Sequence, residues 1–181
     1  MRVTLLLLFS IFSFSSCKKN ELDALPPATQ IGNNTFGCLI NGVAWVPNGG
    51  RGFSPDKAVE GGFQDNLNDP NQRWNVWIRT ARNDGSFMDI YLHNVFKKGV
   101  YFLNFDTAVR PTIFFPQNYI YYYDRNSNYI TTSQYSGKVM ITEADTLLPN
   151  IISGNFEFTG YDAASKKTIS VTNGRFDTRN K

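Results

Sequence analysis

The sequence predicts an all-β domain that forms an antiparallel β-sandwich or a β-barrel of about nine to eleven strands, with little helix. Aromatic residues make up 15% of the 181 residues, and nine of them are tyrosines; both features favour strands. Short apolar segments alternate with Gly, Asn, Asp and Pro clusters typical of turns. No segment longer than about ten residues carries apolar side chains at helical spacing.

The first predicted element is a β-hairpin. Residues 35–40 and 43–46 are mostly apolar, and Asn41-Gly42 between them accepts the positive φ angles of a type I′ turn. The hairpin therefore has both its strands and its turn specified locally.

A long loop follows over residues 48–73, which are rich in Gly, Asn, Asp and Pro. Loops of this length are uncommon in compact domains. We expect it to be functional, to form a poorly ordered edge, or to contain a short strand near residues 58–63.

A second hairpin is predicted from residues 74–81 and 86–94, which flank the turn residues 83–85. The same alternation predicts further strands at 99–105, 119–123, 129–132, 137–142, 152–159 and 168–171. Residues 173–177 close the domain. The pattern does not separate a sandwich from a barrel, and a lipocalin-like barrel is one alternative.

The first 16 residues have the features of a signal peptide. Arg2 supplies a positive charge, residues 3–14 are mostly apolar, and Ser15-Ser16 precede Cys17. As a helix, the apolar stretch would span under about 20 Å, too short for a bilayer core of about 30 Å. We therefore expect export rather than a transmembrane segment.

Cys17 resembles the cysteine of a bacterial lipobox, which is lipidated and becomes the mature N-terminus. Phe14 departs from the usual aliphatic residue three positions before it. An ordinary secretory signal with an incidental cysteine is the alternative. The lipoprotein interpretation makes residues 17–33 a lipidated N-terminus with a flexible tether, and residues 34–181 a single β domain held at the outer membrane.

The sequence contains no recognisable catalytic set. His93 is the single histidine, which excludes His-rich zinc sites and most catalytic triads. Cys38 is predicted to be a small buried residue of a strand. Phosphate-binding glycine motifs are absent from the sequence. We therefore predict no catalytic residue, no metal ligand and no cofactor.

Two weaker patterns concern oxygen ligands and carboxylates. Asp124, Asn126 and Asn128 match the first half of a calcium loop, but Tyr129 and Tyr135 replace its glycine and glutamate. We therefore expect a polar turn there. A glycosidase-type carboxylate pair stays open, although no spacing selects one. The scattered basic residues argue against nucleic-acid binding.

Aromatic residues on strands are the candidate binding residues. Tyr119, Tyr121 and Tyr123 alternate along one strand, so they share a face that can stack on sugar rings or line an apolar pocket. Cross-strand packing is the structural alternative. Trp74 and Trp77 point to opposite faces of a regular strand, so at most one belongs to the core. The other tyrosines expected on such faces are Tyr91 and Tyr101.

Three parts of the chain together suggest a family. They are the lipobox at Cys17 with residues 25–30, the segment 34–47, and the pair of segments 152–158 and 172–177. These parts resemble a family of small lipoproteins of unknown function from Bacteroidota-type bacteria. The resemblance implies an envelope-anchored all-β domain and assigns no catalytic residues.

The resemblance is strongest at the two ends of the chain, over residues 17–47 and 136–177. Its motifs have a structural explanation, with glycines at turns and with Trp45 and Phe176 in the core. We expect a lipid-anchored, non-catalytic binding or accessory module for a glycan, a lipid or a protein partner. A carboxylate-dependent glycan hydrolase is the first alternative, and a purely structural envelope protein is the second.

Overall fold

The computed structural model describes residues 20–52, 55–65, 74–95, 97–106, 117–146 and 150–179. The predicted leader, Cys17 and part of the 48–73 loop lie outside the described residues. The described chain begins with one short 3₁₀ helix, η1 (Glu21–Ala24), and continues with strands only. No helix within these residues is long and apolar enough to cross a membrane.

The eleven strands follow one another along the chain. Their bounds are β1 (Thr35–Ile40), β2 (Val43–Trp45), β3 (Val59–Asp65), β4 (Trp74–Ala81), β5 (Phe87–Val95), β6 (Gly99–Phe102), β7 (Tyr119–Tyr123), β8 (Asn128–Ile130), β9 (Gly137–Asp145), β10 (Ile151–Asp162) and β11 (Lys167–Arg179).

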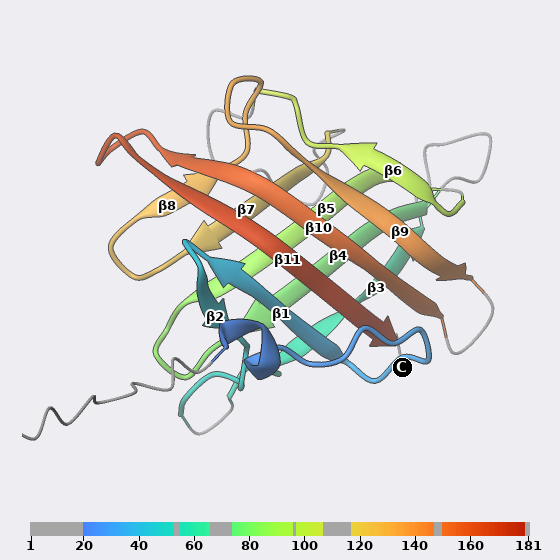
Figure 1. The fold of residues 1–181 in the computed structure, drawn as a ribbon. Helices are drawn as coiled ribbons and strands as arrows, with labels where there is room; N and C mark the ends of the chain where they lie inside the picture. Colours follow the sequence, from blue (N-terminus) through green and yellow to red (C-terminus); the bar gives the residue numbers. More distant parts are fainter. Residues whose placement is uncertain are drawn as a thin grey trace, which may run out of the picture.

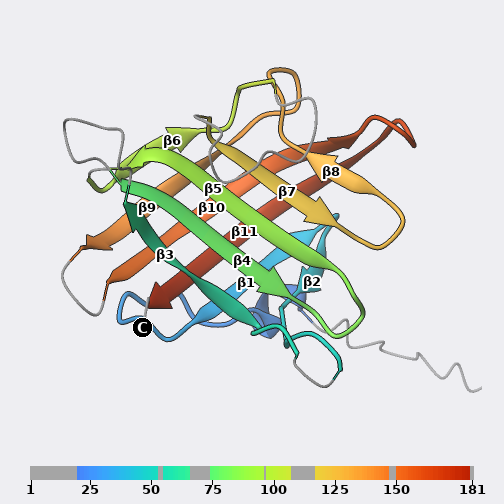
Figure 2. The ribbon, with the colours of Figure 1, turned by 180° about the vertical axis from the view of Figure 1, so that it is seen from behind.

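All strands belong to one antiparallel sheet that curls into a half-barrel (Figures 1 and 2). The front half of Figure 1 contains β1, β11, β10, β9 and β6, and the back half contains β7, β5, β4 and β3. Strand β8 pairs with both β10 and β7, and so joins the two halves. The predicted all-β class is confirmed, and the architecture left open by the sequence is a curled sheet.

Both predicted hairpins are present. Asn41 and Gly42 have φ angles of 49° and 82°, and Ile40 pairs with Val43 across the turn, as a type I′ turn requires. In the second hairpin, β4 and β5 pair along their length around a turn that contains Gly85 at φ 89°. Local turn chemistry therefore determined these two elements.

One of the forms predicted for the long loop is confirmed, and one strand is longer than predicted. The long loop contains the strand β3, which was one of its three predicted forms. Strand β11 continues to Arg179, beyond the predicted strand at residues 168–171. Phe156 pairs with Gly174 and Phe158 with Val171, so one extra residue of β11 forms a bulge. Pairing on both sides of the bulge keeps the strand continuous.

The hydrophobic core fills the space between the two halves of the sheet. Ile78, Ile90 and Ile120 occupy one cross-strand row and are almost fully buried. Trp45 and Phe176 are also buried, which confirms their predicted place in the core. Burial of so much apolar surface is the main stabilising contribution to this fold.

Cys38 lies in β1 with no exposed surface. Burial raises the pKa of its thiol far above the ordinary value, so the reactive thiolate form is suppressed. The prediction that Cys38 is a buried small residue is confirmed.

The N-terminal residues 20–34 form a strap against the outer surface of β1 and β11. Leu25 of the strap is buried, and a Cβ atom added to Gly37 would lie 2.7 Å from Cδ of Pro26. The strap therefore passes β1 where only a glycine leaves room. A flexible tether was expected up to residue 33, and the packing of residues 20–33 differs from that expectation.

Asp177 of β11 holds the strap in place. Its carboxylate accepts hydrogen bonds from Thr29 Oγ1 at 2.6 Å, from Gly32 N at 2.8 Å and from Ser153 Oγ at 2.7 Å. The amides of residues 31 and 33 also donate to it. Burial by itself raises the pKa of Asp177, but these hydrogen bonds outweigh it and lower the pKa. The buried carboxylate is therefore satisfied as an anion.

Candidate functional site

The outer surface of the back half carries a layer of aromatic side chains, here called the aromatic face. It consists of Trp77 on β4, Phe87 and Tyr91 on β5, and Tyr119, Tyr121 and Tyr123 on β7. Alternate residues of a strand point to the same side. Because β4, β5 and β7 are neighbours, their outward-pointing residues form one continuous layer.

Cross-strand register brings these rings together in rows. Trp77 lies opposite Tyr91, and Tyr91 lies opposite Tyr119, while Phe87 lies opposite Tyr123. The ring centroids of Tyr91 and Tyr119 are 5.4 Å apart with an interplanar angle of 24°. The ring centroids of Phe87 and Tyr123 are 5.3 Å apart. These distances lie in the range in which aromatic pairs attract.

The aromatic face has a buried floor and a more accessible rim. Tyr91, Tyr119 and Tyr121 are only 2%, 5% and 7% exposed. Trp77, Phe87 and Tyr123 are half-buried. Burial raises the pKa of Tyr91, so its hydroxyl stays protonated. The rim residues are therefore the ones that present ring surface to a ligand.

A pair of opposite charges interrupts the rings. Arg79 Nε lies 3.2 Å from Asp89 Oδ1, and the arginine side chain is 48% exposed whereas the aspartate is 11% exposed. Glu60 of β3 lies opposite Arg79 in the register. The tyrosine hydroxyl of Tyr121 donates a hydrogen bond to Asn128 of β8. Polar donors and acceptors are thus interleaved with the rings.

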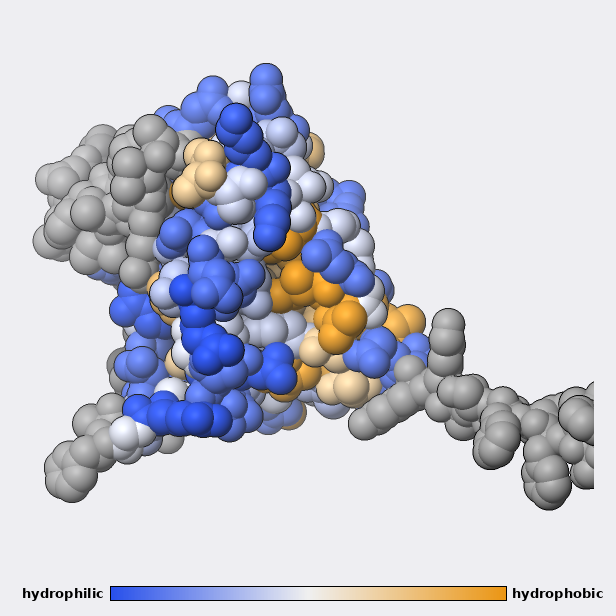
Figure 3. Space-filling view, turned by 90° about the vertical axis from the view of Figure 1, so that its left-hand side faces the viewer, coloured by the Kyte–Doolittle hydropathy of each residue, from blue (hydrophilic) through white to orange (hydrophobic). Residues whose placement is uncertain are grey.

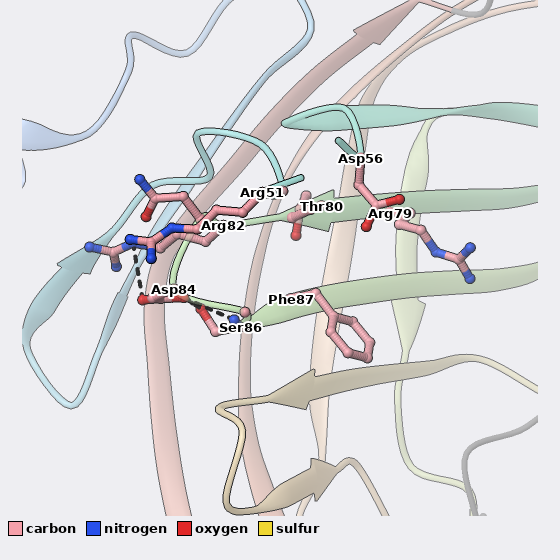
Figure 4. Close-up of a pocket in the computed structure, with 12 residues that line it drawn as sticks. Arg51, Asp56, Arg79, Thr80, Arg82, Asp84, Ser86 and Phe87 are labelled. Atoms are coloured by element: carbon pink, nitrogen blue, oxygen red, sulfur yellow. Dashed lines mark hydrogen bonds and ion pairs between the residues drawn. The ribbon is translucent and has the colours of Figure 1, made fainter. Parts of the chain in front are cut away.

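A cavity of about 580 Å³ adjoins the aromatic face at the turn between β4 and β5 (Figure 4). Phe87 belongs to both the cavity lining and the aromatic face. Arg79, the ion-pair partner of Asp89, also lines the cavity. The lining also includes four more charged residues, which are Arg51, Asp56, Arg82 and Asp84. The volume is sufficient for a small ligand or for one end of a longer one.

Asp84 is held as a carboxylate at the edge of this cavity. It accepts hydrogen bonds from Ser86 N at 2.8 Å and Ser86 Oγ at 2.6 Å, and Arg82 Nε lies 3.4 Å away. Burial by itself raises the pKa of Asp84, but the hydrogen bonds from Ser86 and the charges of Arg82 and Arg125 outweigh it, so the pKa is lowered. Asp84 is therefore an acceptor, not a proton donor.

Four of the five aromatic residues predicted as binding residues come together. Trp77, Tyr119, Tyr121 and Tyr123 all belong to the aromatic face. Trp74 instead packs against the core, 6.3 Å from the ring of Phe63. The two tryptophans therefore lie on opposite sides of the sheet, as their spacing predicted. The other predicted position, Cys17, lies outside the described residues.

The structure also places residues that sequence reasoning missed or placed differently. Phe87 and the pair Arg79–Asp89 were not singled out, although Phe87, Asp89 and Tyr91 alternate along β5 and could have been found by that spacing. Tyr101 packs against the core and donates its hydroxyl to Lys97 O.

The two polar candidates of the sequence have structural partners. His93 Nδ1 lies 3.0 Å from Asn75 Oδ1. Asp124 Oδ1 accepts from the amides of Asn126 and Ser127, which forms the predicted polar turn between β7 and β8. Within the described residues, no three His, Cys, Asp or Glu side chains gather as a metal-binding group.

Comparisons with known proteins place the chain in a family. No curated protein and no solved structure matches it. A family model described as a domain of unknown function (DUF6252) matches residues 76–178, a range that contains the whole aromatic face. Because this range is more than half of the sequence, the chain belongs to the DUF6252 family.

Proposed function

We propose that the protein is a non-catalytic envelope lipoprotein that binds a neutral glycan on its aromatic face. One observation carries the glycan proposal. The aromatic face presents the half-buried rings of Trp77, Phe87 and Tyr123, and one of them, Phe87, also lines a cavity of about 580 Å³ that contains side chains of both charges. Sugar rings combine an apolar face with hydroxyl groups, so they match both features.

The charges at this surface support a neutral ligand. Arg79 lies against Asp89, and Arg82 lies against Asp84. Each pair offers both donors and acceptors to sugar hydroxyls and leaves little net charge to attract an ion. The rings supply stacking surface with little loss of side-chain freedom on binding, because they are already packed against the buried tyrosines of the same face.

The carboxylates give less support to a hydrolase. Asp56 and Asp84 line the same cavity, but a glycosidase general acid needs a raised pKa, and the pKa of Asp84 is lowered. The other described carboxyl groups with a displaced pKa are also displaced downward; they are Asp106, Glu143, Asp162 and Asp177.

The anchor rests on the sequence alone. A positive residue, a short apolar stretch and small residues before Cys17 fit a lipoprotein signal. We propose that Cys17 carries the lipid, including a palmitate, and that the lipid holds the domain at the outer membrane. In cells fed labelled palmitate, the wild type should take up label and sediment with membranes. Cys17→Ala should do neither, and a membrane-bound, unlabelled wild type would contradict the anchor.

Thermal unfolding of residues 20–181 with a panel of candidate ligands tests whether the protein binds a glycan. The panel holds neutral oligosaccharides of glucose, mannose, galactose and N-acetylglucosamine, with envelope lipids as a second class. A ligand at 100 times its Kd stabilises the fold by about 2.7 kcal/mol, which shifts the Tm by several degrees. A shift with an oligosaccharide supports glycan binding. Shifts with lipids alone contradict it, and a flat panel favours a protein partner or a structural role.

A further inference from the structure

The strap brings the start of the described chain to one fixed place on the domain. Asn20 Oδ1 accepts from Leu22 N at 3.2 Å at the start of η1. Glu21 Oε2 accepts from Ala44 N of β2 at 2.8 Å. With Leu25 buried and Asp177 holding the strap further on, the chain leaves the domain beside β2 in a defined position.

Apolar side chains are exposed at this place. Leu22 of η1 is 42% exposed and Val43 of β2 is 62% exposed, and η1 and β2 contact each other. Figure 3 shows the side of the molecule that carries β2, with a group of apolar residues framed by hydrophilic ones. We call Leu22 and Val43 the exit pair.

Cys17 is three residues before Asn20 in the sequence. Three peptide units span at most about 11 Å. A lipid on Cys17 would therefore hold the exit pair close to the headgroups, since the strap leaves no long flexible segment between them. Lys18 and Lys19 add two positive charges in this short stretch, which suit anionic lipids.

We propose that this end of the domain rests on the bilayer surface and that Leu22 and Val43 enter its headgroup region. The proposal rests on the lipid anchor proposed above and adds a second, protein-borne contact to it. Such a contact fixes how the domain stands on the membrane. It also strengthens retention, because apolar side chains that enter the interface add to the binding free energy of the lipid.

Another exposed apolar group serves as a matched control. Val100 and Phe102 of β6 are 48% and 60% exposed, and Met140 of β9 lies opposite Val100. They belong to the upper right of Figure 1, whereas η1 lies at the lower left. A lipid on Cys17 does not bring this group to the bilayer.

Residues 17–181 coupled at Cys17 to a single myristoyl chain through maleimide test the proposal. Cys38 is fully buried and its thiol pKa is raised, so coupling is directed to Cys17. The variants are Leu22→Asp with Val43→Asp, and the control Val100→Asp with Phe102→Asp. Sedimentation with vesicles of phosphatidylethanolamine and phosphatidylglycerol gives the bound fraction, and thermal unfolding confirms that each variant is folded.

We expect the exit-pair variant to partition at least about tenfold more weakly than the wild type, because carboxylates replace side chains that enter the lipid. The control should stay within about twofold. Equal partitioning of all three proteins, or an equal loss in the control, would overturn the membrane contact. Because the chain is attached chemically, this result is independent of palmitate labelling in cells, which tests the anchor separately.

Discussion

The two outer surfaces of the curled sheet are covered in different ways. On the front half, the strap crosses β1 and is held by hydrogen bonds to Asp177. On the back half, aromatic rings stack on one another and leave Trp77, Phe87 and Tyr123 half-buried. The first surface is closed by the chain itself, and the second keeps ring surface available.

This difference separates stability from binding. Asp177 satisfies five donors from the strap and from β10, so its loss leaves buried polar groups without partners. Trp77 and Phe87 instead keep part of their surface in solvent. We therefore expect substitutions on the front surface to act on folding, and substitutions at the rim of the aromatic face to act on ligand affinity.

The largest expected effect is that of Asp177→Ala. It leaves buried donors unpaired, and it should lower the free energy of unfolding by about 3 kcal/mol. Urea unfolding measures the change. Asp23→Ala is the control, because Asp23 lies on the same strap and its hydrogen bond with Asn20 is exposed. Equal losses for both variants would contradict the role assigned to Asp177.

A smaller effect is expected for Gly37→Ala, because the added Cβ would lie 2.7 Å from Pro26 Cδ. Overpacking of this kind costs about 1 to 3 kcal/mol. Combining it with Pro26→Ala should recover part of the loss, which a double-mutant cycle in urea detects. Strictly additive losses would show that the strap does not pack closely there.

The Asp177 carboxylate also makes stability depend on pH. Its pKa is lower in the folded state than the value of about 3.9 in unfolded chains. The ionised carboxylate therefore makes its full contribution to the free energy of unfolding at pH values above about 3.9. As the pH falls through the folded pKa, the contribution is lost. Asp177→Asn should therefore give a shallower decline in Tm below about pH 4 than the wild type. Parallel curves would argue against this linkage.

The smallest effect is expected on the front surface away from the strap. Lys138 Nζ lies 2.9 Å from Glu157 Oε1, and both side chains are half exposed. Surface ion pairs contribute about 0 to 1 kcal/mol, so Lys138→Ala should change the free energy of unfolding by less than about 0.5 kcal/mol. A loss of stability as large as that of Gly37→Ala would contradict the small contribution expected of this surface ion pair.

The elements that sequence reasoning placed well are those determined by neighbouring residues. The hairpin turn at residues 41–42 and the alternation of Tyr119, Tyr121 and Tyr123 need no knowledge of the rest of the chain. The shared surface of Trp77 and these tyrosines needed the sheet order, in which β5 lies between β4 and β7. That order is set by contacts between distant parts of the chain.

The strap shows what local pattern cannot reveal. Residues 20–33 include charged residues and Pro26-Pro27 and have no apolar periodicity, so their pattern is that of a linker. Their packing depends on Asp177, which is 145 positions away from Gly32. Local pattern is also insufficient for strand β11. Asn173-Gly174 has the residue types of a turn, but β11 pairs with both neighbouring strands on either side of these residues, which form a bulge.

Titration of an oligosaccharide that shifts the Tm tests the central claim, that the rim of the aromatic face binds a glycan. The proteins are the wild type, Trp77→Ala, Phe87→Ala and the control Phe102→Ala, whose ring is exposed on the other half of the sheet. Loss of a stacked ring should weaken Kd at least about tenfold in the first two variants, with the control unchanged. Unchanged affinity in Trp77→Ala and Phe87→Ala, with both proteins folded, would contradict the claim.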